Sequence, residues 1–290
     1  MFKVLFSLFR KKNNNTTDGE TAEMSFMEHI DELRAHLFRS AIATAVGAVV
    51  VWYYDNFIIK KILMGPTHSD FITYTFLCKL SKKFNLGSDL CLQTITIKMQ
   101  NTVVWGQFGV YFNIILIGGF ILAFPYIFWE FWKFAKPALK PKELKNTRGV
   151  IFWVSFLFFI GILFGYLVVA PYTVNFFAKF SMDDNIENRW TIGSYFSTVV
   201  PLILASGLSF QMPLVIYFLA KLGVVSSAFL AKTRRYAILI IVILVSIITP
   251  PDMLSTIICS IPLVILYEIS ILLCKKVEAS NLKNNPSEWS

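Results

Sequence analysis

Charged residues are scarce in this chain. Asp, Glu, Lys and Arg make up only 16% of its 290 residues, whereas 56% are hydrophobic and 16% are aromatic. A soluble domain of this length needs a larger share of polar residues to cover its surface. The composition therefore excludes an ordinary soluble enzyme or binding domain and indicates that lipid is the main solvent.

Residues for catalysis and metal binding are also few. The three histidines, His29, His36 and His68, are too scattered for a metal cluster, and there is no HExxH, glycine-rich phosphate loop or nucleophile elbow. An intramembrane hydrolase would need a base beside Ser206 or Ser209, but no predicted span contains a histidine. We therefore expect no enzymatic activity, no cofactor and no metal.

Long apolar runs are abundant instead. A bilayer core about 30 Å thick needs roughly 20 apolar residues per helix. Six runs approach or exceed this length, near 37–58, 106–129, 150–171, 195–220, 236–249 and 253–273. We predict an all-α integral membrane protein with six transmembrane helices over 25–275, preceded by a cytoplasmic extension over 1–24 and followed by a cytoplasmic polar tail over 276–290.

The distribution of basic residues predicts the orientation. Six spans place both termini on one side, and most of the 27 Lys and Arg residues fall in the segments on that side. Cytoplasmic segments carry the excess of Lys and Arg. Both termini are therefore expected in the cytoplasm.

Three features depart from straight, regular spans. Ser25 and Glu28 have the spacing of a capping box, which predicts a helix start there and an amphipathic helix on the cytoplasmic surface before it turns into span 1. Pro201 and Pro213 predict a kink in span 4. Span 5 is only about 20 Å long, so 236–273 forms either two short spans or one re-entrant hairpin.

A few polar residues are candidates for binding or structural roles. Glu32 and Glu143 are expected on the cytoplasmic side, either as solvated charges paired with nearby Lys or Arg or as acceptors for guanidinium groups, which carboxylates bind through two parallel bonds. Gln211 lies within a span and either joins two helices of this chain or contacts a partner. Cys78 and Cys91 share the long loop assigned to the periplasm, where they could form a disulfide.

An ordered series of motifs resembles the TatC family, the multispanning subunit of the twin-arginine protein translocase. The motifs are Met27 to Arg34 with Leu37, Pro125, Trp132 to Leu139 with Glu143, Phe158 to Pro171, Gly207 to Pro213, Arg234 to Tyr236, Thr249 to Asp252, and Leu266 to Glu268. They cover about 25 to 275. In the family, Arg is common at the position of His36, and Glu is usual at the position of Gln211.

The resemblance implies a concave bundle with short spans 5 and 6 that acts as a receptor for signal peptides with two consecutive arginines. Glu32 and Glu143 would hold these arginines, with Phe134 beside them and Arg34 in the same site. Gln211, Asp252 and Glu268 would be polar contacts within the membrane.

The implied partners are TatA- and TatB-type single-span subunits, lipid and further copies of the chain, without nucleic acid. Together they would export folded proteins across the bacterial inner membrane on the proton-motive force. The alternative is a six-span transporter for small solutes or ions, which would require paired ionisable residues at the centres of the spans.

Overall fold

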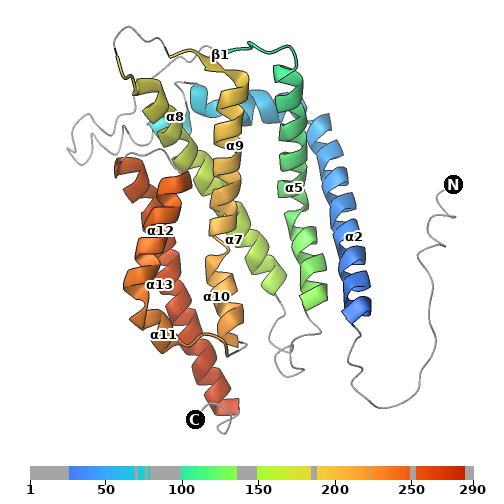
Figure 1. The fold of residues 1–290 in the computed structure, drawn as a ribbon, viewed down its shortest axis with the longest axis vertical. Helices are drawn as coiled ribbons and strands as arrows, with labels where there is room; N and C mark the ends of the chain where they lie inside the picture. The colour runs from blue at the N-terminus through green and yellow to red at the C-terminus, as the bar shows by residue number, and fades with distance from the viewer. Residues whose placement is uncertain are drawn as a thin grey trace, which may run out of the picture.

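The computed structural model describes residues 26–68, 71–75, 78, 99–135, 149–183, 188–221, 223–248 and 253–284. In this part of the chain, long helices run back and forth along one axis, with α2 and α5 on one side of the bundle and α12 and α13 on the other (Figure 1). The long helices are α2 (Phe26–Tyr53), α5 (Gly106–Ala135), α7 (Val150–Phe164), α8 (Ala170–Lys179), α9 (Ile192–Ser209), α10 (Met212–Lys221), α12 (Arg234–Ile248) and α13 (Met253–Asn284).

Short elements connect these helices. They are α3 (Asp55–Phe57), the π-helices η1 (Ile58–Leu63) and η4 (Gly165–Val169), the 3-10 helix η2 (Gly65–Thr67), and α11 (Ser227–Lys232). The strands β1 (Met99–Gln100) and β2 (Trp190–Thr191) pair in parallel, with Met99 opposite Trp190. Because η4 continues α7 into α8 without a turn, these three elements form a single long helix.

Four helical stretches are long and apolar enough to cross a membrane. They are Ile30–Tyr53, Gly106–Ala135, Val150–Lys179 and Ile192–Lys221, and they coincide with the first four predicted spans. The helices α12 and α13 occupy the positions of the fifth and sixth predicted spans. That all six cross the bilayer, with both termini in the cytoplasm, stays a prediction.

The N-terminal region differs from the expected surface helix followed by a turn. The helix begins at Phe26, next to the predicted cap, but then continues unbroken to Tyr53. Its first turns therefore extend the first span along the same axis. The reason is that 26–53 contains no proline, and its glycine, Gly47, lies within a packed contact and causes no bend.

The predicted break in span 4 is confirmed. Helix α9 ends at Ser209, and α10 begins at Met212, with a turn at Phe210 and Gln211 between them. Pro213 lies in the first turn of α10, where its missing N–H leaves no hydrogen bond unmade. Pro201 is accommodated within α9.

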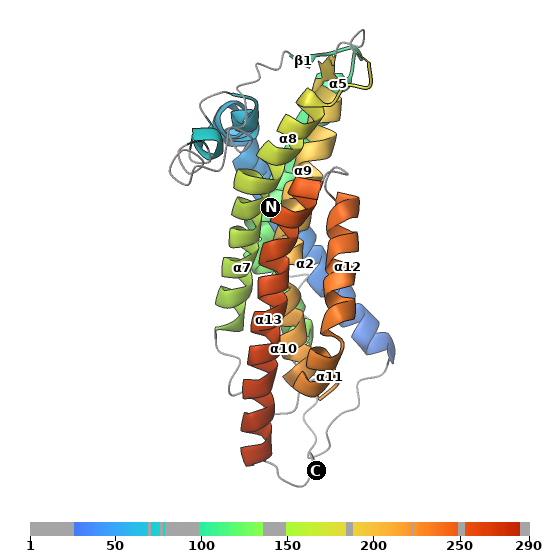
Figure 2. The same ribbon diagram turned by 90° about the vertical axis from the view of Figure 1, so that its left-hand side faces the viewer.

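The last two helices differ in length. Helix α12 has 15 residues, so it is about 22 Å long, as expected for a short span. Helix α13 has 32 residues and continues to Asn284, beyond the predicted boundary at 275 (Figure 2). Its length of about 48 Å exceeds the thickness of the hydrocarbon core, which argues against a shallow re-entrant hairpin.

Glycines set the closest helix contacts. A Cβ atom at Gly47 of α2 would lie 2.5 Å from the carbonyl oxygen of Gly119 of α5, and one at Gly119 would lie 2.5 Å from the amide nitrogen of Ala48. Similarly, a Cβ at Gly161 of α7 would lie 2.8 Å from Cα of Gly207 in α9. Small residues allow the backbones of membrane helices to pack this closely.

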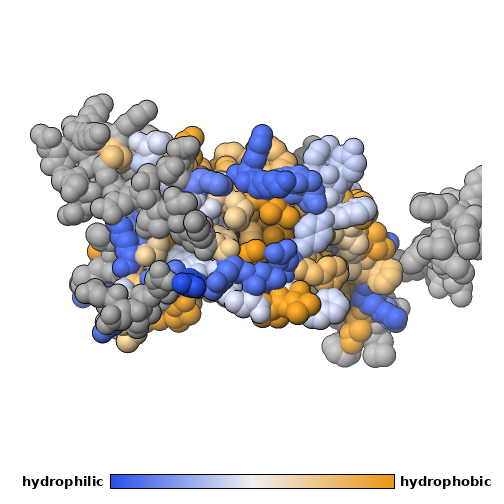
Figure 3. All heavy atoms as spheres, turned by 90° about the horizontal axis from the view of Figure 1, so that it is seen from above, coloured by the Kyte–Doolittle hydropathy of each residue, from blue (hydrophilic) through white to orange (hydrophobic). Residues whose placement is uncertain are grey.

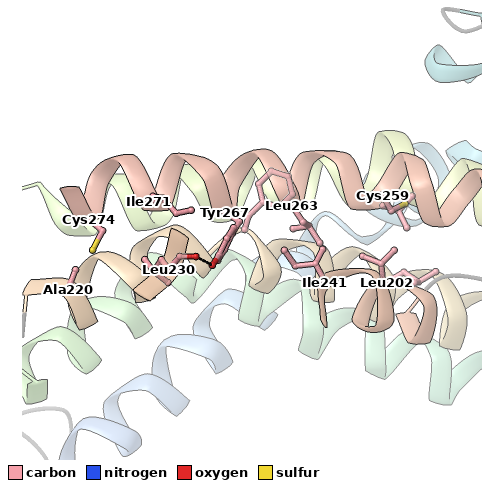
Figure 4. Close-up of a cluster of buried hydrophobic side chains, with 12 residues drawn as sticks. Leu202, Ala220, Leu230, Ile241, Cys259, Leu263, Tyr267, Ile271 and Cys274 are labelled. Carbon is pink, nitrogen blue, oxygen red and sulfur yellow. Dashed lines mark hydrogen bonds between the residues drawn. The ribbon is translucent and has the colours of Figure 1, made fainter. Parts of the chain in front are cut away.

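The largest buried cluster lies between α10, α11, α12 and α13. The Tyr267 hydroxyl donates a 2.9 Å hydrogen bond to the carbonyl of Leu230, which ties the long last helix to α11 (Figure 4). Apolar side chains surround this bond, including Ile241, Leu263 and Ile271. Glu278, further along α13, accepts from the backbone N–H of Ser227 at 2.7 Å and so supports the start of α11.

The opposite end of the bundle, beside β1, is closed by the segment that follows α2. Tyrosine hydroxyls from η4, α9 and the segment after η2 donate to backbone carbonyls of this segment, namely Tyr166 to Ile62, Tyr195 to Leu63 and Tyr74 to Pro66. Burial raises the pKa of the Tyr74 phenol. Seen from this end, hydrophilic side chains gather around a patch of apolar ones (Figure 3).

Candidate functional site

Two polar stripes face one another where α2 begins and α5 ends. Helices α2 and α5 lie side by side and run in opposite directions (Figure 1), and their contact is the most extensive between any two described elements. Residues three and four apart share one face of a helix. The stripes consist of Glu32, His36 and Arg39 on α2 and of Tyr126, Glu130 and Lys133 on α5.

Glu130 is the centre of this cluster. Its side chain is only 1% exposed, and its Oε2 lies 2.6 Å from Nδ1 of His36. Because an ionised carboxylate only accepts hydrogen bonds, Nδ1 of His36 carries the proton and donates it. Lys133 Nζ lies 3.1 Å from Oε1, and Arg39 lies 3.7 Å from Oε2. These contacts supply the partners that a buried carboxylate requires.

Glu32 is the open acid of the cluster. Its side chain is 35% exposed, and its Oε1 lies 3.9 Å from Nε2 of His36. That distance is too long for a hydrogen bond, and it allows an ion pair only when both ring nitrogens of His36 carry a proton. Among the described residues, His36 is the basic side chain that faces Glu32 in this way. The carboxylate therefore keeps its acceptor positions open to solvent.

Aromatic rings flank the polar stripes. Phe134 presents its ring at a steep angle to the His36 imidazole, with 6.2 Å between the ring centroids. The Lys133 ammonium lies 3.9 Å from the centroid of the Trp129 ring, a cation–π contact. Phe134 therefore lies against His36, and Trp129 lies against Lys133.

The structure brings only part of the predicted binding set together. Glu32 and Phe134 both lie against His36, from α2 and α5 respectively. Arg34 is exposed and lies two positions beyond Glu32, about 200° around the helix, so it points away from the cluster. Glu143 lies outside the described residues. The roles of all four residues stay predictions.

Sequence reasoning missed the central residue. Glu130 was not among the predicted site residues, whereas the structure buries it and pairs it with His36, 94 positions away. The helical spacing of Glu32, His36 and Arg39 could have indicated one polar face on α2. His36, noted in the sequence only as a scattered histidine at a position where the family has Arg, is held by this buried carboxylate.

The predicted polar positions within the membrane have diverse surroundings. Gln211 donates from Nε2 to the carbonyl of Val154 in α7 at 3.3 Å, while its buried Oε1 has no hydrogen-bond partner among the described residues. Glu268 of α13 accepts from Nε of Arg234 at 2.9 Å, and both side chains are partly exposed. Asp252 lies outside the described residues.

The cysteines fall into two groups. Cys78 is disulfide-bonded, whereas Cys259 and Cys274 are free and buried. Cys91, the predicted partner of Cys78, lies outside the described residues. Their pairing stays a prediction.

The fold and the site together define a multi-span helical membrane protein with a cluster of acidic and basic residues at one end of its bundle. Residues 28–262 match the TatC family, the Sec-independent protein translocase protein. The chain belongs to this family, so the predicted resemblance is confirmed. It is accordingly a subunit of a protein translocase rather than a small-solute transporter.

Relatives match over nearly their whole length. A Sec-independent protein translocase protein TatC from Blattabacterium sp. subsp. Periplaneta americana is 44% identical to this chain. The match covers 87% of this chain and 96% of the relative. TatCy of Bacillus subtilis is 34% identical over 92% of this chain and 94% of its own. A crystal structure of the twin-arginine translocase receptor TatC in DDM superposes with a TM-score of 0.66 at 30% identity, covering 85% of this chain and 99% of that one.

Proposed function

We propose that this chain is the receptor subunit that recognises twin-arginine signal peptides at the cytoplasmic face of the translocase. The single observation that carries this proposal is the open carboxylate of Glu32 at the end of the α2–α5 pair. Beside it, Glu130 is already saturated by His36, Arg39 and Lys133. Glu32 is therefore the acid of the cluster that can accept a cation from outside.

Arginine fits this acid better than lysine does. The guanidinium fork forms two parallel charge-assisted hydrogen bonds to a carboxylate, whereas an ammonium acts as a point charge. Phe134 packs against the same histidine as Glu32 and so adds an aromatic ring to the proposed site. We assign the second arginine of the signal to Glu143.

The apolar stretch of the signal would then lie against the membrane part of the bundle. An apolar hollow of about 580 Å³ between α7, α10 and α13 supports this step. Its lining includes Trp153, Leu157, Leu214 and Leu273, and it reaches Gly149 at the start of α7. A hollow of this kind accommodates apolar side chains without burying a charge.

The remaining parts of the proposed function follow from family membership. We assign the chain to the bacterial inner membrane, where it assembles with TatA- and TatB-type single-span subunits and with further copies of itself. The assembly would move folded proteins outward on the proton-motive force. The chain itself would bind signal peptides and organise the partner subunits, and it would catalyse no covalent reaction.

The test is the affinity of the protein in lipid nanodiscs for a signal peptide with Arg-Arg, compared with the same peptide with Lys-Lys. We expect the wild-type protein to prefer Arg-Arg. Glu32→Gln should weaken Arg-Arg binding by about 1.5 to 3 kcal/mol, the contribution of a hydrogen bond to a charged group, and remove the preference.

Asp31→Asn is the matched control, because Asp31 is an exposed acid on the neighbouring position of the same helix. This variant removes the same charge and should leave the preference intact. Equal loss in both variants would mean that Glu32 acts only through net charge. A preference that survives Glu32→Gln would remove Glu32 from the site.

A further inference from the structure

The side chain of a half-exposed glutamate on a helix samples several rotamers unless its neighbours restrict it. A neighbour that faces the Glu32 carboxylate is the imidazole of His36, one turn further along α2. His36 is itself buried, with a side chain 11% exposed. The orientation of its ring therefore determines where Nε2 faces the Glu32 carboxylate, and the doubly protonated ring attracts the carboxylate at that point.

The ring of His36 is held from the opposite helix. Nδ1 donates to the buried carboxylate of Glu130 at 2.6 Å, and this bond directs the second ring nitrogen, Nε2, towards Glu32. Phe134 restricts the ring further through its edge contact. The carboxylate of Glu130 is in turn fixed by Lys133, whose ammonium rests on the Trp129 ring.

We propose that His36 and Glu130 are positioning residues that orient Glu32 for the incoming arginine of the signal. The chain of contacts runs from Glu130 through the imidazole to Glu32 and crosses from α5 to α2. This inference rests on the proposed function, because it assigns a role within the same receptor site. Neither residue touches the ligand. Both act through the placement of Glu32.

Two properties of the cluster support this role over a purely structural one. The two nitrogens of His36 face two different carboxylates, one buried and one open, and a residue that served only to pair with Glu130 would not need the second contact. The buried member also sequesters Lys133 and Arg39. Their charges are thereby held at Glu130 and do not neutralise Glu32.

The experiment measures the ratio of Arg-Arg to Lys-Lys peptide affinity in nanodiscs for a set of variants. His36→Gln and Glu130→Gln should each lower the ratio about tenfold, and the double variant should be no worse than either single one, since both break the same chain of contacts. His36→Arg should keep the wild-type ratio, because the arginine guanidinium carries donors for both carboxylates.

The control is Asp55→Asn. Asp55 of α3, the short helix directly after α2, accepts a 2.9 Å hydrogen bond from Tyr111 of α5 and so ties the end of the α2 region to α5 at the opposite end of the bundle. A general loosening of the contact between α2 and α5 would lower the ratio in this variant as well. We expect it to remain at the wild-type value.

The outcomes separate the two proposals. If Glu32→Gln leaves the ratio unchanged, the receptor site itself is wrong. If Glu32→Gln removes the preference for the Arg-Arg peptide while His36→Gln and Glu130→Gln retain it, only the positioning role is overturned. If Glu130→Gln does not fold, a loss in His36→Gln together with retention in His36→Arg supports the role, and a loss in both overturns it.

Discussion

One polar side chain in the interior, Gln211, has one paired and one unpaired polar atom. From the turn between α9 and α10 it donates from Nε2 to the carbonyl of Val154 in α7, and it leaves Oε1 buried without a partner among the described residues. An unpaired acceptor in a membrane helix is costly and often marks a functional contact. We therefore infer that Oε1 accepts a hydrogen bond from a partner helix.

Replacement of Gln211 by Leu tests this inference. The change removes one long hydrogen bond but also removes the unpaired acceptor, so the thermal stability in detergent should change by less than about 1 kcal/mol. Recovery of the single-span subunits on affinity purification of the variant should fall. Normal recovery would limit Gln211 to a contact within this chain, whereas a large loss of stability would contradict the assigned geometry.

At the scale of elements, the site depends on how closely α2 and α5 approach each other. The two stripes belong to different helices, and the contact between Gly47 and Gly119 fixes the distance between these helices. Residues on one helix cannot reach the other when the backbones move apart by the width of a methyl group. The glycines therefore determine the geometry of a site about three turns away.

Gly119→Ala should consequently disturb both stability and binding. Its Cβ would lie 2.5 Å from the amide nitrogen of Ala48, where backbone cannot yield, and such overpacking costs about 1 to 3 kcal/mol. The measurements are thermal unfolding and Arg-Arg peptide affinity of the same preparation, and both should decrease.

Gly109→Ala provides the matched control on the same helix. A Cβ at Gly109 would meet no atom within 4 Å, and alanine favours a helix over glycine by about 0.5 to 1 kcal/mol. We expect unchanged binding and equal or higher stability. Equal damage from both substitutions would show that the contact between Gly47 and Gly119 has no special role.

At the scale of the whole molecule, the helices do not match one bilayer thickness. The 15 residues of α12 span about 22 Å, whereas the hydrocarbon core is about 30 Å thick. Four other helical stretches are long enough for a full-thickness membrane. If α12 crosses the bilayer as predicted, we expect the bilayer to become thinner beside it, at a cost of a fraction of a kcal/mol per Å.

Stability should accordingly depend on the length of the lipid chains. In vesicles of monounsaturated phosphatidylcholine, the temperature of thermal unfolding should be higher with 14-carbon chains than with 22-carbon chains, because the thinner bilayer matches α12. A variant with four additional leucines in α12 should shift the optimum towards longer chains. The same optimum for both proteins would show that α12 does not govern the match.

The sequence by itself determined the features that depend on local order. Apolar runs identified the membrane class and the positions of the helices, prolines predicted a kink in span 4, and the ordered motifs identified the family. The first two signals each lie within about 20 to 30 residues, the length over which a helix and its hydration are determined.

Only the tertiary structure decided which distant residues meet. The bond between His36 and Glu130 joins positions 94 apart, and nothing in the spacing around either residue indicates the other. The close contact between Gly47 and Gly119 likewise depends on the register of two packed helices. Such contacts arise from the packing of whole helix surfaces, which is why the open and the buried glutamate could be told apart only in the folded chain.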